Sequence, residues 1–185
     1  GEHRGYLRLR PSARHRRAVV RLGEECWVVM DKVQTSGSHR WEVNWLFPDV
    51  PHAMLSDAGI ENGLTLEMSA GGYQIRWFAP HSDLRVDLVR ADPLTTRGWC
   101  SRYYLKKEPA LSLRLSLTGG SGTIFTVFAP EDIEVSMSTD QLLLCRQHWS
   151  AELKVATDHS AAHLLVKSLK YVEGDEVEEL TLYTP

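Results

Sequence analysis

The sequence has few cysteines, no long apolar run and none of the motifs that usually mark a catalytic centre. Its three cysteines, Cys26, Cys100 and Cys145, are odd in number and widely spaced. This pattern argues against a disulfide framework and against a zinc site built on close cysteine pairs. Cys26 and Cys145 lie in apolar runs, so both are predicted to be buried thiols. The longest apolar runs, such as 27–30, fall far short of the ~20 residues of a membrane-spanning helix.

Sequence signatures of catalysis and of cofactor binding are also missing. There is no nucleophile elbow, dinucleotide fingerprint or phosphate-binding loop, and the glycine-rich stretch 119–122 lacks a following Lys-Ser/Thr pair. His159 and His163 have the spacing of two metal ligands on a helix, but an apolar strand-like run follows them and no third ligand is obvious. A surface turn is favoured there. The sequence predicts no metal site and no cofactor within these residues. It leaves open whether these residues have catalytic activity by themselves.

The net charge of −3 is small, but the basic residues are unevenly placed. Seven arginines crowd the first 22 residues: Arg4, Arg8, Arg10, Arg14, Arg16, Arg17 and Arg21. A basic stretch can bind a polyanion. The favoured interpretation is a solvated strand face whose charges protect a sheet edge from pairing with other strands. No aromatic residues interleave with the arginines as a single-strand stacking platform requires, which argues against nucleic acid as a partner.

The dominant feature present is period-two alternation of apolar and polar residues. It runs through 41–45, 64–68, 84–88, 111–117 and 133–137, and turn residues such as Gly71-Gly72 separate the runs. Alternation of this kind is typical of half-buried antiparallel strands. We expect an all-β fold: a two-sheet antiparallel β-sandwich of about a dozen strands with little helix, forming one domain over residues 1–185.

One long stretch, Ala91 to Pro109, lacks this alternation and combines aromatic with cationic side chains. Long loops in compact domains are often functional, and sugar rings stack on aromatic faces while arginine matches carboxylate and sulfate groups. The alternative is a loop that its aromatic residues pack against the sheet. Trp41, Trp45 and Trp77 are predicted to be core residues. The candidate substrate-binding residues are Arg97, Trp99, Tyr103, Tyr104 and Lys107.

His39 is the weak catalytic candidate. It stands at the start of the strand predicted over 41–47, eight residues after Asp31, and the two could meet across a hairpin. A histidine in that place can act as an acid or base, or can simply bond at the sheet margin, which is the favoured interpretation.

Several segments, in order, resemble the C-terminal region of the heparinase II/III-like family of bacterial polysaccharide lyases. These are Gly5-Tyr6-Leu7-Arg8-Leu9, His15 to Val20, Trp27 to Val33, Gly37-Ser38-His39 with Trp41 to Pro48, Arg97 to Ser101 with Tyr104 and Lys107-Glu108-Pro109, and Phe125 to Pro130. Together they cover about residues 5–130. Cys100 stands where we expect an aromatic residue.

The resemblance implies an N-terminal α/α-toroid that these residues support, and β-elimination on acidic polysaccharides such as heparan sulfate or alginate. It also implies catalytic residues, and in some members zinc, upstream of Gly1. Periplasmic or secreted bacterial localisation follows from the same resemblance. The partners expected are the toroid and an acidic polysaccharide, with no nucleic acid and no membrane. The alternative is a non-catalytic module that binds carbohydrate or a protein surface.

Overall fold

The computed structural model describes residues 1–57, 60–80, 83–138, 140–155 and 166–181, and His159 and His163 lie outside these ranges. The described part is almost entirely strand, with one short 3-10 helix, Gly5–Arg8. Its sixteen strands are β1 (Glu2–His3), β2 (Ala13–Leu22), β3 (Cys26–Thr35), β4 (His39–Pro48), β5 (His52–Asp57), β6 (Ile60–Met68), β7 (Gly71–Phe78), β8 (Arg85–Arg90), β9 (Trp99–Tyr103), β10 (Lys106–Gly119), β11 (Gly122–Pro130), β12 (Glu134–Met137), β13 (Gln141–Arg146), β14 (Trp149–Val155), β15 (Val166–Glu173) and β16 (Glu176–Thr181).

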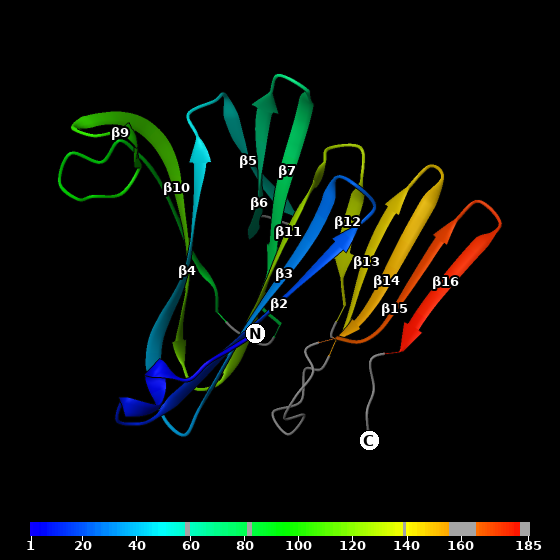
Figure 1. The fold of residues 1–185 in the computed structure, drawn as a ribbon, viewed down its shortest axis with the longest axis horizontal. Coiled ribbons are helices and arrows are strands. Elements are labelled where there is room, and N and C mark those ends of the chain that lie inside the picture. The colour runs from blue at the N-terminus through cyan, green and yellow to red at the C-terminus, as the bar shows by residue number, and fades with distance from the viewer. Residues whose placement is uncertain (58–59, 81–82, 139, 156–165, 182–185) are drawn as a thin grey trace.

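The strands of the described residues form three antiparallel sheets (Figure 1). The central sheet has the order β1-β2-β3-β11-β7-β6-β5. The β4 sheet has the order β4-β10-β8, with β9 paired to β10, and the C-terminal sheet runs β12-β13-β14-β15-β16. The all-β prediction is confirmed, and so is the antiparallel pairing. The expected pair of sheets is replaced by three, and the strands exceed the dozen expected.

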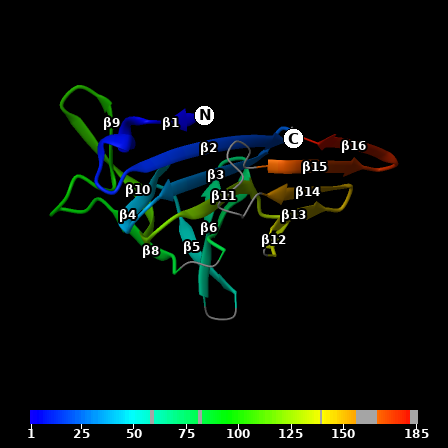
Figure 2. The ribbon, with the colours of Figure 1, turned by 90° about the horizontal axis from the view of Figure 1, so that it is seen from below.

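Strands β3 and β11 in the middle of the central sheet are buried on both faces, because the other two sheets pack on its opposite sides (Figures 1 and 2). On β11, Phe125 and Val127 point to the C-terminal sheet while Ile124 points to the β4 sheet. Strand β3 is therefore buried at every position from Val28 to Val33. A strand buried on both faces has no solvated side, so its sequence lacks the period-two alternation, which hides the third sheet.

The core between the central and β4 sheets confirms the main alternating pattern. Leu111, Leu113, Leu115 and Leu117 all lie on the inner face of β10. Trp77 is 2% exposed in the same core. Trp41 and Trp45 pack against it from β4 but stay half-buried. The predicted core role of the tryptophans thus holds fully for Trp77 and in part for the other two.

The cysteines are all free thiols, but only one is buried as predicted. Cys26 is buried, and burial raises its pKa to about 11. Cys145 is exposed because Leu142 and Leu144 take the inward positions of β13, which turns the next residue outward. The prediction of a buried Cys145 is wrong for that reason. In the described residues no helix has the length and apolar character needed to cross a membrane.

Candidate functional site

The stretch Ala91 to Pro109, predicted as an irregular loop, contains a hairpin. Strand β9 pairs with the first part of β10, and the chain turns at Tyr104-Leu105. The prediction missed these strands because most residues on both faces are exposed, so no apolar alternation marks them. Only 91–98 runs without a strand, and the hairpin projects from one end of the β4 sheet (Figure 1).

Two of the predicted binding residues hold this segment in place. The guanidinium of Arg97 donates to the Asp87 carboxylate and carbonyl and to the Ser112 hydroxyl and carbonyl. The indole Nε1 of Trp99 donates to the Asp92 carbonyl at 2.9 Å. The ammonium of Lys107 lies 4.0 Å from the centroid of the Trp99 ring. Arg97 and Trp99 therefore anchor the segment, with Lys107 stacked on one of them.

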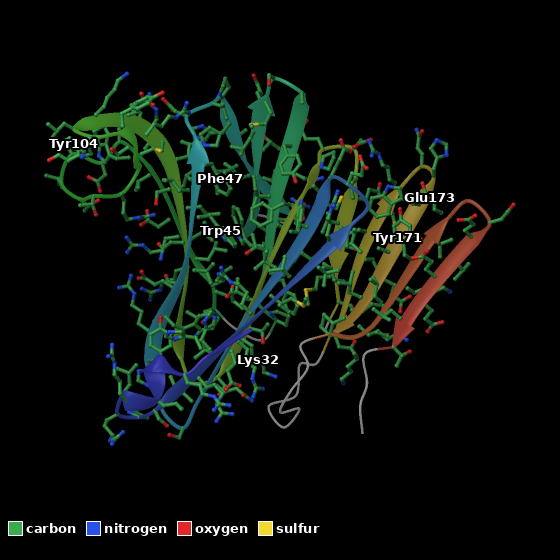
Figure 3. The ribbon with its side chains drawn as sticks, in the orientation of Figure 1. Lys32, Trp45, Phe47, Tyr104, Tyr171 and Glu173 are labelled. Carbon is green, nitrogen blue, oxygen red and sulfur yellow. The ribbon has the colours of Figure 1, made fainter. Side chains whose placement is uncertain are left out.

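The other predicted residues form an exposed tip. Tyr103 is 69% exposed and Tyr104 is 92% exposed, and Leu105 beside them is 90% exposed. Arg102 and Lys106 flank them, each near the Glu108 carboxylate. Figure 3 shows Tyr104 at the outer end of the hairpin, away from the three sheets. Two phenol rings beside cations at a projecting turn form a surface suited to contact with another molecule.

The anchoring role of Arg97 predicts a stability difference between neighbouring arginines. Arg97→Ala should lower the free energy of unfolding by about 2 kcal/mol, because the Asp87 and Ser112 carbonyls and the Asp87 carboxylate lose the hydrogen bonds that the guanidinium donates. Arg102→Ala is the matched control, since its side chain is 68% exposed and its carboxylate partner lies 3.5 Å away. We expect the control to change stability by less than about 0.5 kcal/mol. Chemical denaturation measures both, and equal losses would refute the anchoring role.

His39 and Asp31 line one cavity but do not bond to each other. A carbonyl can only accept, so His39 Nε2 donates to the Pro11 carbonyl at 2.7 Å. Asp31 instead accepts from His15 Nε2 at 2.7 Å and from Arg17 Nε and Nη2 at 2.7 and 2.9 Å. The structure therefore places His39 at the sheet margin, and the carboxylate expected near it is directed elsewhere.

Asp31 is a buried carboxylate that accepts hydrogen bonds from two side chains of the neighbouring strand, His15 and Arg17. Burial raises its pKa, but hydrogen bonds from His15 and Arg17 outweigh burial, so the pKa of Asp31 lies below its usual 3.8. The Arg17 guanidinium also lies over the Trp45 ring, 5.3 Å from its centroid. A histidine backed by a buried carboxylate is oriented and can exchange a proton. Sequence reasoning missed His15 and Arg17, because the strand pairing that places Arg17 opposite Asp31 is not visible in the sequence.

Two cavities lie between β4 and the central sheet, one near each end of β4. The one containing His39 has a volume of about 420 Å³. The other, of about 730 Å³, is lined by aromatic rings including Phe47 and Tyr73 and by carboxylates at its rim. Burial raises the pKa of Tyr73 to about 12, and its hydroxyl donates to the Glu25 carbonyl. Trp45 lies between the two, with Nε1 donating to Thr126 Oγ1 at 3.3 Å (Figure 3).

Within the ranges that the structure describes, no three His, Cys, Asp or Glu side chains are grouped as metal ligands.

Comparison with known families connects this architecture to a family of proteins. Residues 1–140 match the family model described as "Heparinase II/III-like, C-terminal". The chain belongs to this heparinase II/III-like family. The match covers the central sheet, the β4 sheet with its hairpin and the start of the C-terminal sheet, so the family resemblance seen in the sequence is confirmed.

Solved structures of heparinase III share the fold. A heparinase III described as the BT4657 gene product superposes with a TM-score of 0.55 and 15% sequence identity, over 91% of this chain and 23% of that chain. The same protein with methylated lysines gives a TM-score of 0.54 and 16% identity, over 92% and 24%. This heparinase II/III-like chain thus spans about a quarter of the length of those proteins. No curated protein matches it.

Proposed function

We propose that these residues are the C-terminal β-sandwich region of a polysaccharide lyase that cleaves uronate-containing polysaccharides by β-elimination. The family match over residues 1–140 is the observation that carries the proposal. Heparan sulfate and alginate represent the class of acidic polymer, and the parent protein is periplasmic or secreted by a bacterium.

β-Elimination needs a base that removes the proton at C5 of the uronate and an acid that protonates the departing O4. The charge that develops on the uronate carboxylate must also be neutralised. In our proposal an N-terminal α/α-toroid supplies the base, the acid and the groups that neutralise the carboxylate. It also holds the zinc ion, if the parent protein has one. The residues described here brace the toroid and extend the substrate cleft. This division is supported by the placement of the described histidines that line cavities: His15 is bonded to Asp31 and His39 to the Pro11 carbonyl, while His148 lines a separate cavity.

The hairpin tip is the best candidate for a substrate contact in this chain. Tyr103 and Tyr104 present ring faces and hydroxyl groups, while Arg102 and Lys106 supply positive charge beside them. Pyranose rings stack on aromatic faces, and carboxylate or sulfate groups accept hydrogen bonds from arginine and lysine. Arg97 and Trp99 contribute by fixing the hairpin in position rather than by touching the polymer.

The proposal is tested on the full-length parent protein. Incubation with heparan sulfate, alginate and other uronate polymers should give a rise in ultraviolet absorbance, since β-elimination leaves a double bond conjugated to the carboxylate. No unsaturated product from any acidic polymer would count against a lyase.

Removing the tip should weaken substrate binding more than the chemical step. We expect the variant Tyr104→Ala with Lys106→Ala to raise KM about tenfold at nearly constant kcat, because contacts remote from the reacting bond bind ground state and transition state alike. Leu94→Ala is the matched control, since Leu94 is 92% exposed on the adjacent 91–98 segment. A fall in kcat with KM unchanged would contradict this role of the tip.

The second candidate function is a non-catalytic module that binds carbohydrate or a protein surface. The exposed tip, without an assembled catalytic centre beside it, is the observation in its favour. Glycan binding that depends on Tyr103 and Tyr104, in a parent that yields no unsaturated product, would favour this alternative.

A further inference from the structure

Strand β4 is a long and regular sheet edge. Among the described residues it pairs only with β10, and it does so over ten consecutive positions, from His39 opposite Gly119 to Pro48 opposite Ala110. The pairing carries no register shift, and the only proline of β4 is its last residue. The backbone groups that point away from β10 therefore form a straight row of donors and acceptors. Such a row is a template for another strand.

The other sheet edges in the described residues carry the features that usually prevent strand addition. β5 has six residues and a register shift between Leu55 and Ser56. β8 also has six, and the Arg97 side chain bonds to the Asp87 carbonyl on it. β2 is covered in part by β1, β12 has four residues, and β16 is rich in glutamate. Short, bulged, covered or charged edges resist pairing. β4 carries Arg40 and Glu42, but it is ten residues long, and among the described residues it has neither a register shift nor a covering strand.

The inward side chains of β4 are incompletely covered. Trp41, Trp45 and Phe47 face the central sheet together with Val43, yet only Val43 is buried, at 5% exposure. Figure 3 shows Trp45 and Phe47 directed from β4 into the space beside the central sheet. Large apolar rings left half-exposed along one strand mark a surface at which further apolar atoms can be buried.

The 420 Å³ cavity lies against this same edge. It is lined by the consecutive β4 residues 39–44, whose side chains point alternately to opposite faces of the sheet. A cavity lined by side chains from both faces of the sheet must lie beside the strand and not over one face of it. Its other wall is the central sheet, including His15, Asp31 and Val33. Space is therefore present for the inward side chains of a strand added next to β4.

We propose that the outer edge of β4 binds an extended strand contributed by another part of the parent polypeptide, which continues the β4 sheet past the cavity. This inference rests on the proposed function for the existence of a longer parent chain. Only an extended peptide offers alternating N–H and C=O groups that match a strand edge, together with alternating side chains for the cavity and the solvent. The solved heparinase III chains match this one over only about a quarter of their length, so about three quarters of each lies outside the matched part.

The test is amide hydrogen exchange at residue resolution on the full-length parent protein. In a bare edge strand, amides bonded to β10 exchange slowly while those between them exchange fast. We expect slow exchange at successive β4 amides, both those bonded to β10 and those that point away from it. The amides that point away should exchange roughly a hundredfold more slowly than in a bare edge strand. β8, the opposite edge of the same sheet, is the internal control and should retain the alternating pattern. Alternating fast exchange along β4 would overturn the proposal.

Dilution identifies the source of the strand. Protection that stays constant over a hundredfold dilution supports a strand from the same polypeptide. Protection that falls on dilution indicates a second copy, and protection that needs added heparan sulfate indicates a glycan; either result overturns the proposal. The ultraviolet assay on the same preparation separates the two claims. Protection without lyase product would refute the proposed function alone, and lyase product without protection would refute the added strand alone.

Discussion

Replacing Trp77 with alanine is expected to lower the free energy of unfolding by about 3–5 kcal/mol. Trp77 is 2% exposed on β7, where it packs in the core between the central and β4 sheets. Neighbours such as Leu113 and Ile75 lie in strands paired on both sides, so they cannot move into the vacated space. The loss therefore combines removal of a large buried ring with the cost of an unfilled cavity.

The matched control for this substitution is Trp27→Ala. Trp27 is 39% exposed, and the Arg21 guanidinium lies 5.5 Å from its ring centroid. Loss of a partly exposed ring and one cation–π contact should cost about 1 kcal/mol. Denaturant titration followed by circular dichroism measures both variants. Equal losses at the two positions would show that Trp77 does not occupy the core described here.

Asp31→Asn is expected to lower the free energy of unfolding at pH 7 by about 2 kcal/mol. The substitution removes the charge that His15 and Arg17 bind and leaves at most one good acceptor for their three hydrogen bonds. Both partners are partly exposed and can regain water, which keeps the loss below that of a fully buried ion pair.

The effect of Asp31 should depend on pH in one direction. Its pKa in the folded protein is lower than the usual 3.8 of the unfolded chain. The carboxylate therefore contributes its full stabilisation above that value, and the contribution disappears as the pH falls through the lower, folded-state pKa. The gap between wild type and Asp31→Asn should be constant from pH 7 to about 5 and shrink below about 4. A gap that widens on acidification would show that the sign of the shift is wrong.

Asp49→Asn provides the comparison for a surface ion pair. Asp49 bonds to the Arg90 guanidinium at 2.6 and 2.7 Å, and this hydrogen bonding lowers the pKa of Asp49 as well. Because water and salt screen an exposed pair, its removal should be much less costly than removal of Asp31. Adding salt should reduce the Asp49 effect further and leave most of the Asp31 effect.

The sequence predicts well the strands that have one buried and one solvated face. Trp41 to Trp45 is the clearest case, because Val43 is buried in the core while Glu42 and Asn44 on the other face are exposed. It predicts poorly the strands at the two extremes of burial. Val28 to Val33 is buried on both faces and β9 is exposed along most of its length, so neither shows a period of two. The third sheet and the hairpin were missed for these opposite reasons.

The candidate site was also predictable only in part. Residue type alone marked Tyr103 and Tyr104 as members of an unusual aromatic and cationic segment; the structure exposes both, and their binding role stays a prediction. Residue type could not show that Arg97 is engaged with Asp87 and Ser112, since that depends on the packing of 91–98 against β8 and β10. The Asp31 cluster needed the register of β2 on β3, which only the folded chain provides.

We propose that the parent protein breaks its polymer by elimination rather than by hydrolysis, and one measurement tests this proposal most directly. The full-length protein is incubated with heparan sulfate or alginate in water enriched in the heavy oxygen isotope. The masses of the cleaved oligosaccharides are then measured by mass spectrometry. An elimination adds no solvent oxygen, so unlabelled products with one unsaturated uronate end are expected. Saturated products carrying heavy oxygen at the cleaved bond, or no cleavage of any acidic polymer, would contradict the account.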